Sequence, residues 1–404
     1  MHYQRTTRCG QAHVSTEAGY LIRTEATCSI SAPSYYPKKT ESVRGEPFPG
    51  KETEMRIVDL RSDTFTLPTD EMRRAMYEAE LGDDCYGEDP TVNLLEQRSA
   101  ALLGKEAGLF TVSGTMSNLI ALLTHTRAGD EVIVGSESHI LWYEVGGASA
   151  LGGATLRAIP NEADGRLDLD VIEATIRPED IHYPPTALLC LENTHNRCGG
   201  TVLTAEYTES ACDVAHRHGL AVHLDGARIF NAAVFLGTTA AQLASPVDSV
   251  CFCLSKNLSA PVGSVLCGSS EFIARARKKR KMLGGGMRQA GVIAAAGLVA
   301  LDTTLKRLAR DHENARRLAA GLARIPGVSC SPETPPTNIV MFSLPARTPT
   351  ATFIDRLYER GVKLNYPEGP RIRAVTHRMI EAEDVDWALH RTEDVARELS
   401  GRPV

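Results

Sequence analysis

Short apolar runs alternate with longer amphipathic segments over most of this chain, beginning near Arg56. Apolar runs of about four to eight residues, bounded by turn residues, are typical of strands buried on both faces. Most of the runs are separated by stretches long enough for a helical crossover. This order predicts an α/β fold with a mainly parallel, helix-covered sheet. The predicted strands cover residues 108–112, 131–134, 154–159, 187–191, 220–224, 250–254 and 264–267.

The first 54 residues lack this pattern. They are rich in Ser, Thr, Pro and charged residues and hold no sustained apolar period, so we expect a disordered N-terminal extension. Transit peptides are usually poor in acidic residues, and here acidic residues lie among the basic ones. The support for a targeting role is therefore weak. The ordered pattern then opens with two predicted helices, one over residues 68–80 and one over residues 91–104, each starting beside a residue suited to cap a helix.

The pattern changes again near residue 300. A long helical period from residue 289 to about residue 322 leads out of the region of the predicted sheet. Short strand candidates at residues 338–343 and 371–375, together with two helices, predict a smaller α+β domain. We therefore expect an extension over residues 1–54, a large domain over residues 55–300 and a small C-terminal domain over residues 301–404.

Composition narrows the class of protein. The 404 residues are 43% hydrophobic and 23% charged, as expected of a globular protein with a large core. The net charge of -6 gives no electrostatic reason to expect nucleic acid or an anionic membrane as partner, and no apolar run approaches the roughly 20 residues of a membrane span. The ten cysteines show neither a CxxC pair nor the Cys/His spacing of a zinc site. We expect buried thiols, no metal and a reducing, cytoplasmic compartment.

Two of the predicted strands end on residues that carry chemistry. One run ends on Asp225, and the run Val250–Leu254 is followed closely by Lys256. Ligands of α/β folds bind beyond the carboxyl ends of parallel strands, so the carboxylate and the amine are expected at one edge of the sheet. This order suggests an enzyme that uses pyridoxal phosphate (PLP), with Lys256 forming the Schiff base and Asp225 keeping the pyridine nitrogen protonated. On local sequence alone, Asp225 also suits a helix N-cap and Lys256 a surface position.

The segment Ser113-Gly114-Thr115 follows a predicted strand and precedes a predicted helix. Backbone N–H groups at a helix start bind phosphate well, and glycine lets the backbone approach closely. These three residues are therefore candidates for binding the phosphate of the cofactor. Alone this signal is weak, because the same residues also form ordinary N-cap turns, and it gains weight only beside the strands that end near Asp225 and Lys256.

Several other residues are candidates for the same site. His139 follows a predicted strand and could stack on a flat ring or transfer a proton, although a single loop histidine is usually structural. Arg228 could reach the ligand of Asp225 or form a salt bridge. Lys281 and Arg288 flank a Gly-Gly-Gly turn and could approach an anion, whereas the other basic residues before the turn suit a solvated helix face.

Taken together, these segments resemble the L-threonine aldolases, including the low-specificity and L-allo types. The resemblance runs in family order from about residue 56 to residue 400. The matching segments are Asp59–Thr64, Gly82–Pro90, Ser113–Met116, Ser138–Ile140, Glu192–Asn196, His223–Asn231, Cys253–Lys256, Gly284–Gln289 and Arg373–His377.

The resemblance implies a fold-type I PLP enzyme that forms a homotetramer with active sites at dimer interfaces. By position, Lys256 corresponds to the lysine that binds the cofactor, Asp225 to the partner of the pyridine nitrogen and His139 to the ring-stacking histidine. Further positions that the resemblance places around the cofactor and the substrate are Ser62, Tyr86, Gly114, Thr115, His125, Arg228, Lys281, Arg288 and Arg373.

The implied reaction is the reversible cleavage of L-threonine or L-allo-threonine to glycine and acetaldehyde. His139 or His125, directly or through water, is the candidate base for the β-hydroxyl proton. Two departures from the family pattern are Asn257, where glycine is usual, and Ser117, where Gly or Ala is common. Another PLP reaction, such as β-elimination or transamination, and a non-enzymatic ligand-binding protein on the same scaffold are the alternatives.

Overall fold

The structure is a computed structural model, and it describes residues 56–346, 348–367, 369 and 371–399. These residues belong to one compact unit that spans residues 55–404. The predicted N-terminal extension lies outside the described residues. Within the described residues, no helix is both long enough and apolar enough to cross a membrane.

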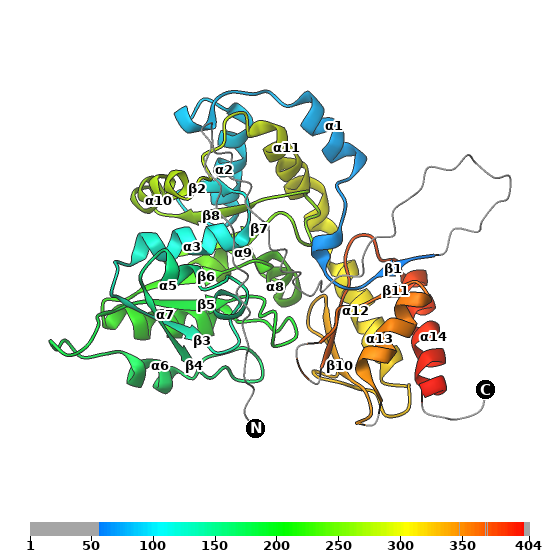
Figure 1. Cartoon of the computed structure of the whole chain (residues 1–404). Helices are drawn as coiled ribbons and strands as arrows, with labels where there is room; N and C mark the ends of the chain where they lie inside the picture. Colours follow the sequence, from blue (N-terminus) through cyan, green and yellow to red (C-terminus); the bar gives the residue numbers. More distant parts are fainter. Residues whose placement is uncertain (1–55, 347, 368, 370, 400–404) are drawn as a thin grey trace, which may run out of the picture. The chain divides into compact units, whose positions relative to one another are not determined.

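Among the described residues, the largest sheet has seven strands, and it lies beside the C-terminal elements in Figure 1. The strand order is β2-β8-β7-β6-β5-β3-β4. Strand β8 runs antiparallel to both of its neighbours, and the other pairs are parallel, which confirms the predicted mainly parallel sheet. The strands are β2 (Ala107–Thr111), β3 (Glu131–Gly135), β4 (Thr155–Ile159), β5 (Thr186–Glu192), β6 (Ala221–Asp225), β7 (Ser249–Cys253) and β8 (Ser264–Gly268).

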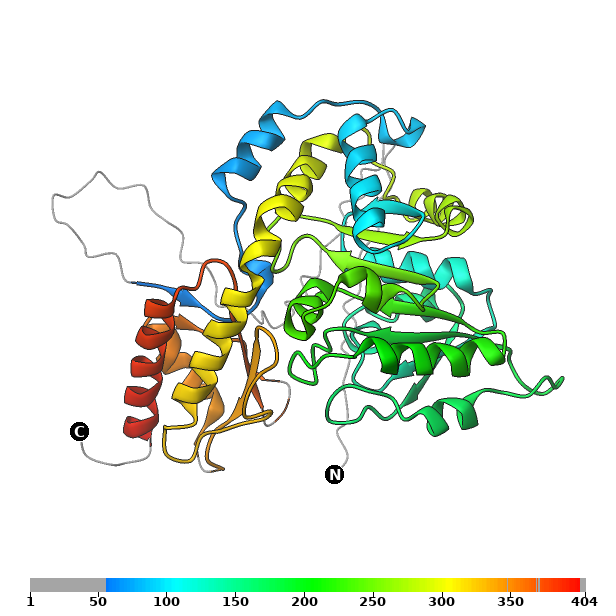
Figure 2. The same cartoon turned by 180° about the vertical axis from the view of Figure 1, so that it is seen from behind.

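Helices cover both faces of this sheet. Helix α3 lies on the face seen in Figure 1, and the green helix α7 lies on the opposite face, seen in Figure 2. Apolar side chains pack between the helices and the strands in three separate clusters. The helices are α1 (Asp70–Glu78), α2 (Pro90–Leu102), α3 (Gly114–His125), α4 (His139–Trp142), α5 (Gly147–Ala150), α6 (Leu169–Thr175), α7 (Ala205–Arg217), α8 (Ile229–Leu236), α9 (Ala240–Ala244) and α10 (Ser270–Met282), with 3₁₀ turns at Asp63–Phe65 and Asp84–Tyr86.

The helical pattern predicted over residues 289–322 is a helical path with an irregular middle. Helix α11 (Gly291–Val299) continues through a π turn at Ala300–Thr304 and a 3₁₀ turn at Leu305–Arg307 into α12 (Leu308–Leu322). In Figures 1 and 2 this yellow path leads from the seven-stranded sheet to the C-terminal elements. The domain boundary predicted near residue 300 falls within this path and stays a prediction.

The C-terminal elements form a second, smaller core. Two predicted strands pair antiparallel with each other, and the two predicted helices are present. The first strand of the described chain joins this region, because β1 (Val58–Asp59) pairs with β11 (Val362–Lys363). The remaining elements are β9 (Ser329–Cys330), β10 (Ile339–Ser343), α13 (Thr350–Glu359), β12 (Ile372–Val375) and α14 (Ala382–Leu399).

Candidate active site

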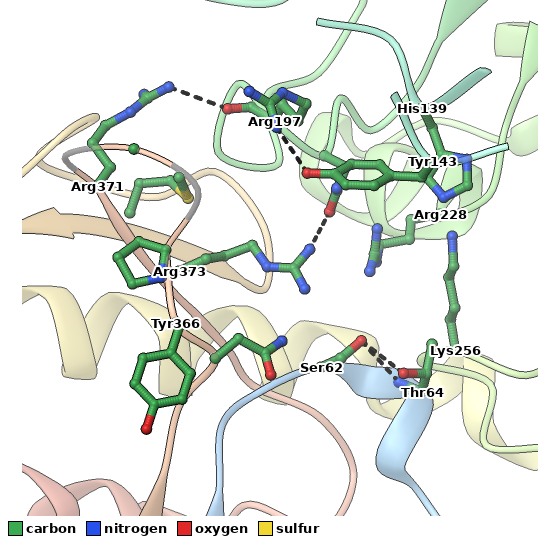
Figure 3. A pocket seen from close by; sticks show the side chains of 15 residues that line it. Ser62, Thr64, His139, Tyr143, Arg197, Arg228, Lys256, Tyr366, Arg371 and Arg373 are labelled. Atoms are coloured by element: carbon green, nitrogen blue, oxygen red, sulfur yellow. Dashed lines mark hydrogen bonds between the residues drawn. The ribbon is translucent and has the colours of Figure 1, made fainter. Parts of the chain in front are cut away.

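A cavity of about 370 Å³ opens beyond the carboxyl end of β7, where residues of the large sheet meet residues of the C-terminal region. Figure 3 shows that the amine of Lys256 and the guanidinium groups of Arg228 and Arg373 point toward the same space. Together with Arg197 and Arg371, they surround the cavity with cationic side chains, which suit an anionic ligand. The cavity is lined by Ser62, Thr64, His139, Tyr143, Asn196, Arg197, Arg228, Lys256, Met341, Asn365, Tyr366, Pro367, Gly369, Arg371 and Arg373.

The strand ends place the predicted carboxylate and amine at one sheet edge. Strands β6 and β7 are neighbours in parallel register, with Asp225 opposite Cys251. The backbone of Lys256 is fixed by a turn, in which the N–H of Ser259 donates to the Lys256 carbonyl over 2.8 Å. Ser259 has a φ of 62°, a left-handed conformation that non-glycine residues adopt rarely and that is common at functional sites.

Asp225 is 3% exposed and is held by hydrogen-bond donors. Asn118 Nδ2 donates to its Oδ2 over 2.8 Å, and the Ala227 N–H donates to its Oδ1 over 3.0 Å. Burial by itself would raise the pKa of this carboxyl. The positive charges of His139 and Lys256 and the Asn118 hydrogen bond outweigh burial, so the pKa lies below its usual value. Asp225 is therefore ionised and presents a buried negative charge.

His139 begins α4 and contacts the acidic groups beside Asp225. Its Nδ1 lies 2.8 Å from Glu144 Oε1, and its backbone N–H donates to Glu192 over 2.7 Å. A ring nitrogen of His139 lies within 4.8 Å of a carboxylate oxygen of Glu144 and of one of Asp225, and these two oxygens are equally close to each other. Burial would lower the pKa of His139, but the Glu144 hydrogen bond and the Asp225 charge raise it above its usual value. Because Nδ1 is engaged, Nε2 is the nitrogen that can meet a ligand.

Arg228 forms the buried ion pair that local sequence left open as an alternative. Its Nε and Nη2 bind the two oxygens of Asp63 over 2.6 and 2.8 Å. Burial would raise the pKa of Asp63, but this bidentate pairing outweighs it and holds the pKa well below its usual range. Arg228 also lines the cavity, so its planar guanidinium is fixed by Asp63 and also faces the cavity. Its predicted role in binding cofactor or substrate stays a prediction.

Arg373 reaches the cavity from β12, in the C-terminal region. Its Nη1 donates to Asn196 Oδ1, and its Nη2 donates to the Arg61 carbonyl over 3.2 Å. Ser62 lies below it in Figure 3 and accepts from the backbone N–H of Thr64 over 3.2 Å. The guanidinium is therefore held in one orientation, as recognition of a carboxylate requires.

The predicted phosphate segment forms the start of α3. Ser113 caps this helix, since its hydroxyl accepts from the Met116 N–H over 3.2 Å. A Cβ atom at Gly114 would lie 2.8 Å from the Cys253 sulfur, so only glycine lets the helix start approach β7 this closely. Both observations fit the N-cap alternative, and phosphate binding by Ser113, Gly114 and Thr115 stays a prediction.

Tyr86, Lys281 and Arg288 form a second group, which is absent from the described lining of the cavity. Lys281 Nζ lies 3.7 Å from the Cys85 sulfur, and Arg288 donates to Asp83 over 3.0 Å. Tyr86 is 76% exposed. Their predicted roles in binding cofactor or substrate therefore find no support within this single chain and stay predictions. That they serve the active site of a neighbouring subunit also stays a prediction.

His125 is also absent from the described cavity lining. It ends α3, stacks on Phe272 with ring centroids 4.5 Å apart, and faces Ser249 at 2.8 Å. Burial lowers its pKa to about 3. This position does not support direct transfer of a substrate proton by His125. Of the two histidines predicted as candidate bases, His139 alone is among the described residues that line the cavity.

Sequence reasoning missed the polar residues behind the site. Asn118, His223 and Ser249 are at most 1% exposed, and Glu144 is 7% exposed. A signal was present, because a histidine inside the buried run Leu220–Leu224 and an asparagine in the apolar face of a helix need polar partners. Arg280 was also missed: it stands in a basic run but is 2% exposed, and its guanidinium contacts Asp84 at 2.8 Å.

Comparison with known proteins shows the family of this chain. A model of the beta-eliminating lyase family matches residues 59–345. Low-specificity L-threonine aldolase 1 of Arabidopsis thaliana is 47% identical over 340 residues, which cover 83% of this chain and 95% of that protein. The chain belongs to the low-specificity L-threonine aldolase family. The resemblance inferred from the sequence motifs is thereby confirmed.

Solved structures show the fold of this aldolase family member. The threonine aldolase of Leishmania major aligns with a TM-score of 0.72 at 21% identity, covering 84% of this chain and 99% of that one. A structure of SPT with PLP internal aldimine aligns with a TM-score of 0.69 at 20% identity, covering 85% and 88%. The predicted fold type I of PLP-dependent enzymes is confirmed.

The residues of the site fit PLP. The ionised, buried Asp225 can bind a cationic N–H donor, and a protonated pyridine nitrogen is one. Lys256 offers an amine to the same cavity, and the start of α3 offers backbone N–H groups next to β7. The amine and the carboxylate therefore fit the aldehyde and the ring nitrogen of this cofactor.

Proposed function

We propose that this protein is a PLP-dependent lyase that reversibly cleaves L-threonine or L-allo-threonine to glycine and acetaldehyde. The observation that carries the proposal is the meeting of Lys256, His139 and Arg373 in one cavity, with ionised Asp225 beside His139. The sequence relatives named threonine aldolases support the same reaction. As a further part of the proposal, the enzyme acts in threonine breakdown and glycine formation as a cytoplasmic homotetramer.

Bound PLP would supply an electron-accepting ring linked to the amino group of the substrate. Lys256 would hold the cofactor through its amine, and Asp225 would keep the pyridine nitrogen positively charged. Arg373 would bind the substrate carboxylate by two parallel hydrogen bonds, with Ser62 assisting. Fixing the carboxylate fixes the torsion about Cα, and this torsion decides which bond of the substrate breaks.

His139 would accept the proton of the β-hydroxyl as the bond between Cα and Cβ breaks. Its Nδ1 faces Glu144, so the ring is held in place while Nε2 faces the ligand space. Only the neutral form of His139 can accept a proton, and the Glu144 hydrogen bond and the Asp225 charge, which raise its pKa against the effect of burial, make that neutral form a stronger acceptor. In this proposal Arg373 is the carboxylate clamp, His139 the base and Asp225 the ionised partner of the cofactor.

Product analysis with L-threonine tests the proposal. We expect equal amounts of glycine and acetaldehyde, and we expect Lys256→Ala to abolish both products and cofactor binding through the lysine. Formation of 2-oxobutanoate would instead indicate β-elimination, and an aminated cofactor would indicate transamination. A protein that stays colourless after incubation with PLP would contradict all three reactions and revive the ligand-binding alternative.

A further inference from the structure

A chain of hydrogen bonds runs beneath α3 from His125 to Asp225. His125 Nε2 lies 2.8 Å from Ser249 Oγ, and Ser249 Oγ lies 2.8 Å from His223 Nδ1. His223 Nε2 lies 3.0 Å from Asn118 Oδ1, and Asn118 Nδ2 donates to Asp225 Oδ2 over 2.8 Å. This chain of hydrogen bonds therefore joins one end of α3 to the candidate active site.

The partners fix the orientation of the Asn118 amide. Its Nδ2 donates to Asp225 and also to Glu144 over 2.7 Å, and an ionised carboxylate such as Asp225 can only accept. The opposite end, Oδ1, must then accept, and it faces His223 Nε2 and the Cys251 sulfur at 3.1 Å. The proton of His223 consequently sits on Nε2.

The direction of the remaining bonds follows. Burial lowers the pKa of His223 to about 4 and that of His125 to about 3, so both rings are neutral at neutral pH. With its proton on Nε2, His223 presents a lone pair at Nδ1, and the Ser249 hydroxyl donates to it. Ser249 Oγ then accepts from His125 Nε2, whose ring is held by stacking on Phe272. Every donor in the chain points toward Asp225.

We infer that this one-way chain is a tautomer lock, in which His125, Ser249 and His223 are positioning residues that keep the Asn118 amide donating to Asp225. If His223 carried its proton on Nδ1, two lone pairs would face each other at Asn118 and the amide would turn its donors away from Asp225. The inference rests on the proposed role of Asp225 as the partner of the pyridine nitrogen. It assigns His125 a role that differs from that of a base.

Kinetics and cofactor binding test the lock. Ser249→Ala removes the central hydroxyl, and we expect kcat and the affinity for PLP to fall by about threefold to tenfold, the worth of one or two buried hydrogen bonds. The matched control is Ser264→Ala, which removes a buried hydroxyl from the neighbouring strand β8, and we expect changes of less than about twofold. Equal losses in the two variants would overturn the inference.

Replacement of His125 separates positioning from proton transfer. His125→Gln keeps an N–H donor near Ser249, and we expect kcat and PLP affinity within about twofold of the wild-type values. His125→Leu removes the donor, and we expect a loss smaller than that of Ser249→Ala, because the Ser249 hydroxyl can still donate to His223. An equal loss in Gln and Leu variants would show that the imidazole itself is required and would overturn the inference.

A neutron diffraction structure of the holoenzyme tests the lock without any variant. We expect deuterium on Nε2 of His223 and of His125, and deuterium on Nδ1 of either ring would contradict the inference. This measurement also separates the lock from the proposed function. A cofactor absent from Lys256 would end the proposed function, whereas the deuterium positions would still decide the direction of the chain.

Discussion

Asp225 and Asp311 are two buried carboxylates on opposite sides of Lys256 in the sequence, and they differ in their hydrogen bonds and in the direction of their pKa shifts. They are 3% and 0% exposed. Asp225 accepts hydrogen bonds from two N–H groups and from the Cys251 thiol, has His139 and Lys256 nearby, and has a lowered pKa. Asp311 Oδ1 has no hydrogen-bond partner among the described residues, and Arg307 Nε lies 3.7 Å from it. Burial, which Arg307 only partly offsets, raises the pKa of Asp311 to about 6.

The comparison shows that burial alone does not decide whether a carboxylate is charged. The donors around Asp225 keep it ionised for use as a permanent negative charge. Asp311 instead belongs to a joint between the sheet region and the C-terminal region. Its Oδ2 accepts from Asn257 Nδ2 over 3.2 Å, and Asn338 donates to Asn257 Oδ1 over 3.0 Å. This joint explains the departure at Asn257, because glycine could form neither bond.

The largest effect should come from Asp225→Asn. The amide has nearly the same shape but supplies no negative charge, so we expect kcat to fall by at least about a hundredfold, as when a key electrostatic group of a buried site is removed. The matched control is Asp311→Asn, which neutralises the other buried carboxylate and should change kcat by less than about threefold. Similar losses of activity in the two variants would break the comparison.

The second effect concerns stability and pH at Asp311. Its pKa rises from 3.8 in the unfolded chain to about 6 in the folded protein. Between these values the folded state binds more protons than the unfolded state, so this group lowers stability as pH rises, by about 3 kcal/mol in total. Asp311→Asn cannot ionise, so we expect its free energy of unfolding, relative to that of the wild type, to increase from pH 4 to pH 7.

Urea unfolding of both proteins over this pH range provides the measurement. The two proteins should differ least at the acidic end, where Asp311 is protonated in the folded wild type and still partly protonated in the unfolded chain. A difference in unfolding free energy that stays constant with pH would show that Asp311 keeps an ordinary pKa in the folded protein.

The smallest effect should come from Asn257→Gly. The substitution leaves Asp311 Oδ2 and Asn338 Nδ2 with one hydrogen bond fewer, and we expect a destabilisation of about 1–3 kcal/mol. Thermal unfolding provides the measurement, and an unchanged or higher Tm would show that the joint adds nothing. Cofactor binding should persist, since Lys256 keeps its place at the cavity.

Local sequence predicted the sheet and its edge well. Each of the seven apolar runs lies within about two residues of a strand, because a buried strand needs a short apolar run whatever its neighbours are. The end of a strand is also a local property. Asp225 and Lys256 could therefore be placed at one edge of the sheet before their spatial positions were known.

The polar network beneath the site could not be predicted in the same way. His125, Ser249 and Asn118 come from different parts of the chain, and their hydrogen bonds depend on how α3 packs against β6 and β7. Arg280 is similar, because a run of basic residues predicts a solvated face and only tertiary packing gives this one arginine its buried partners. The pairing of β1 with β11 is likewise set by contacts far apart in sequence.

The most direct test of the account is reduction of the resting protein with borohydride in the presence of PLP, followed by peptide mapping. We expect one pyridoxyl group per chain, attached to Lys256. The same label should remain in Asp225→Asn, because that variant keeps the amine. A pyridoxyl group on another residue, or none at all, would contradict the central claim that Lys256 and Asp225 hold the cofactor between them.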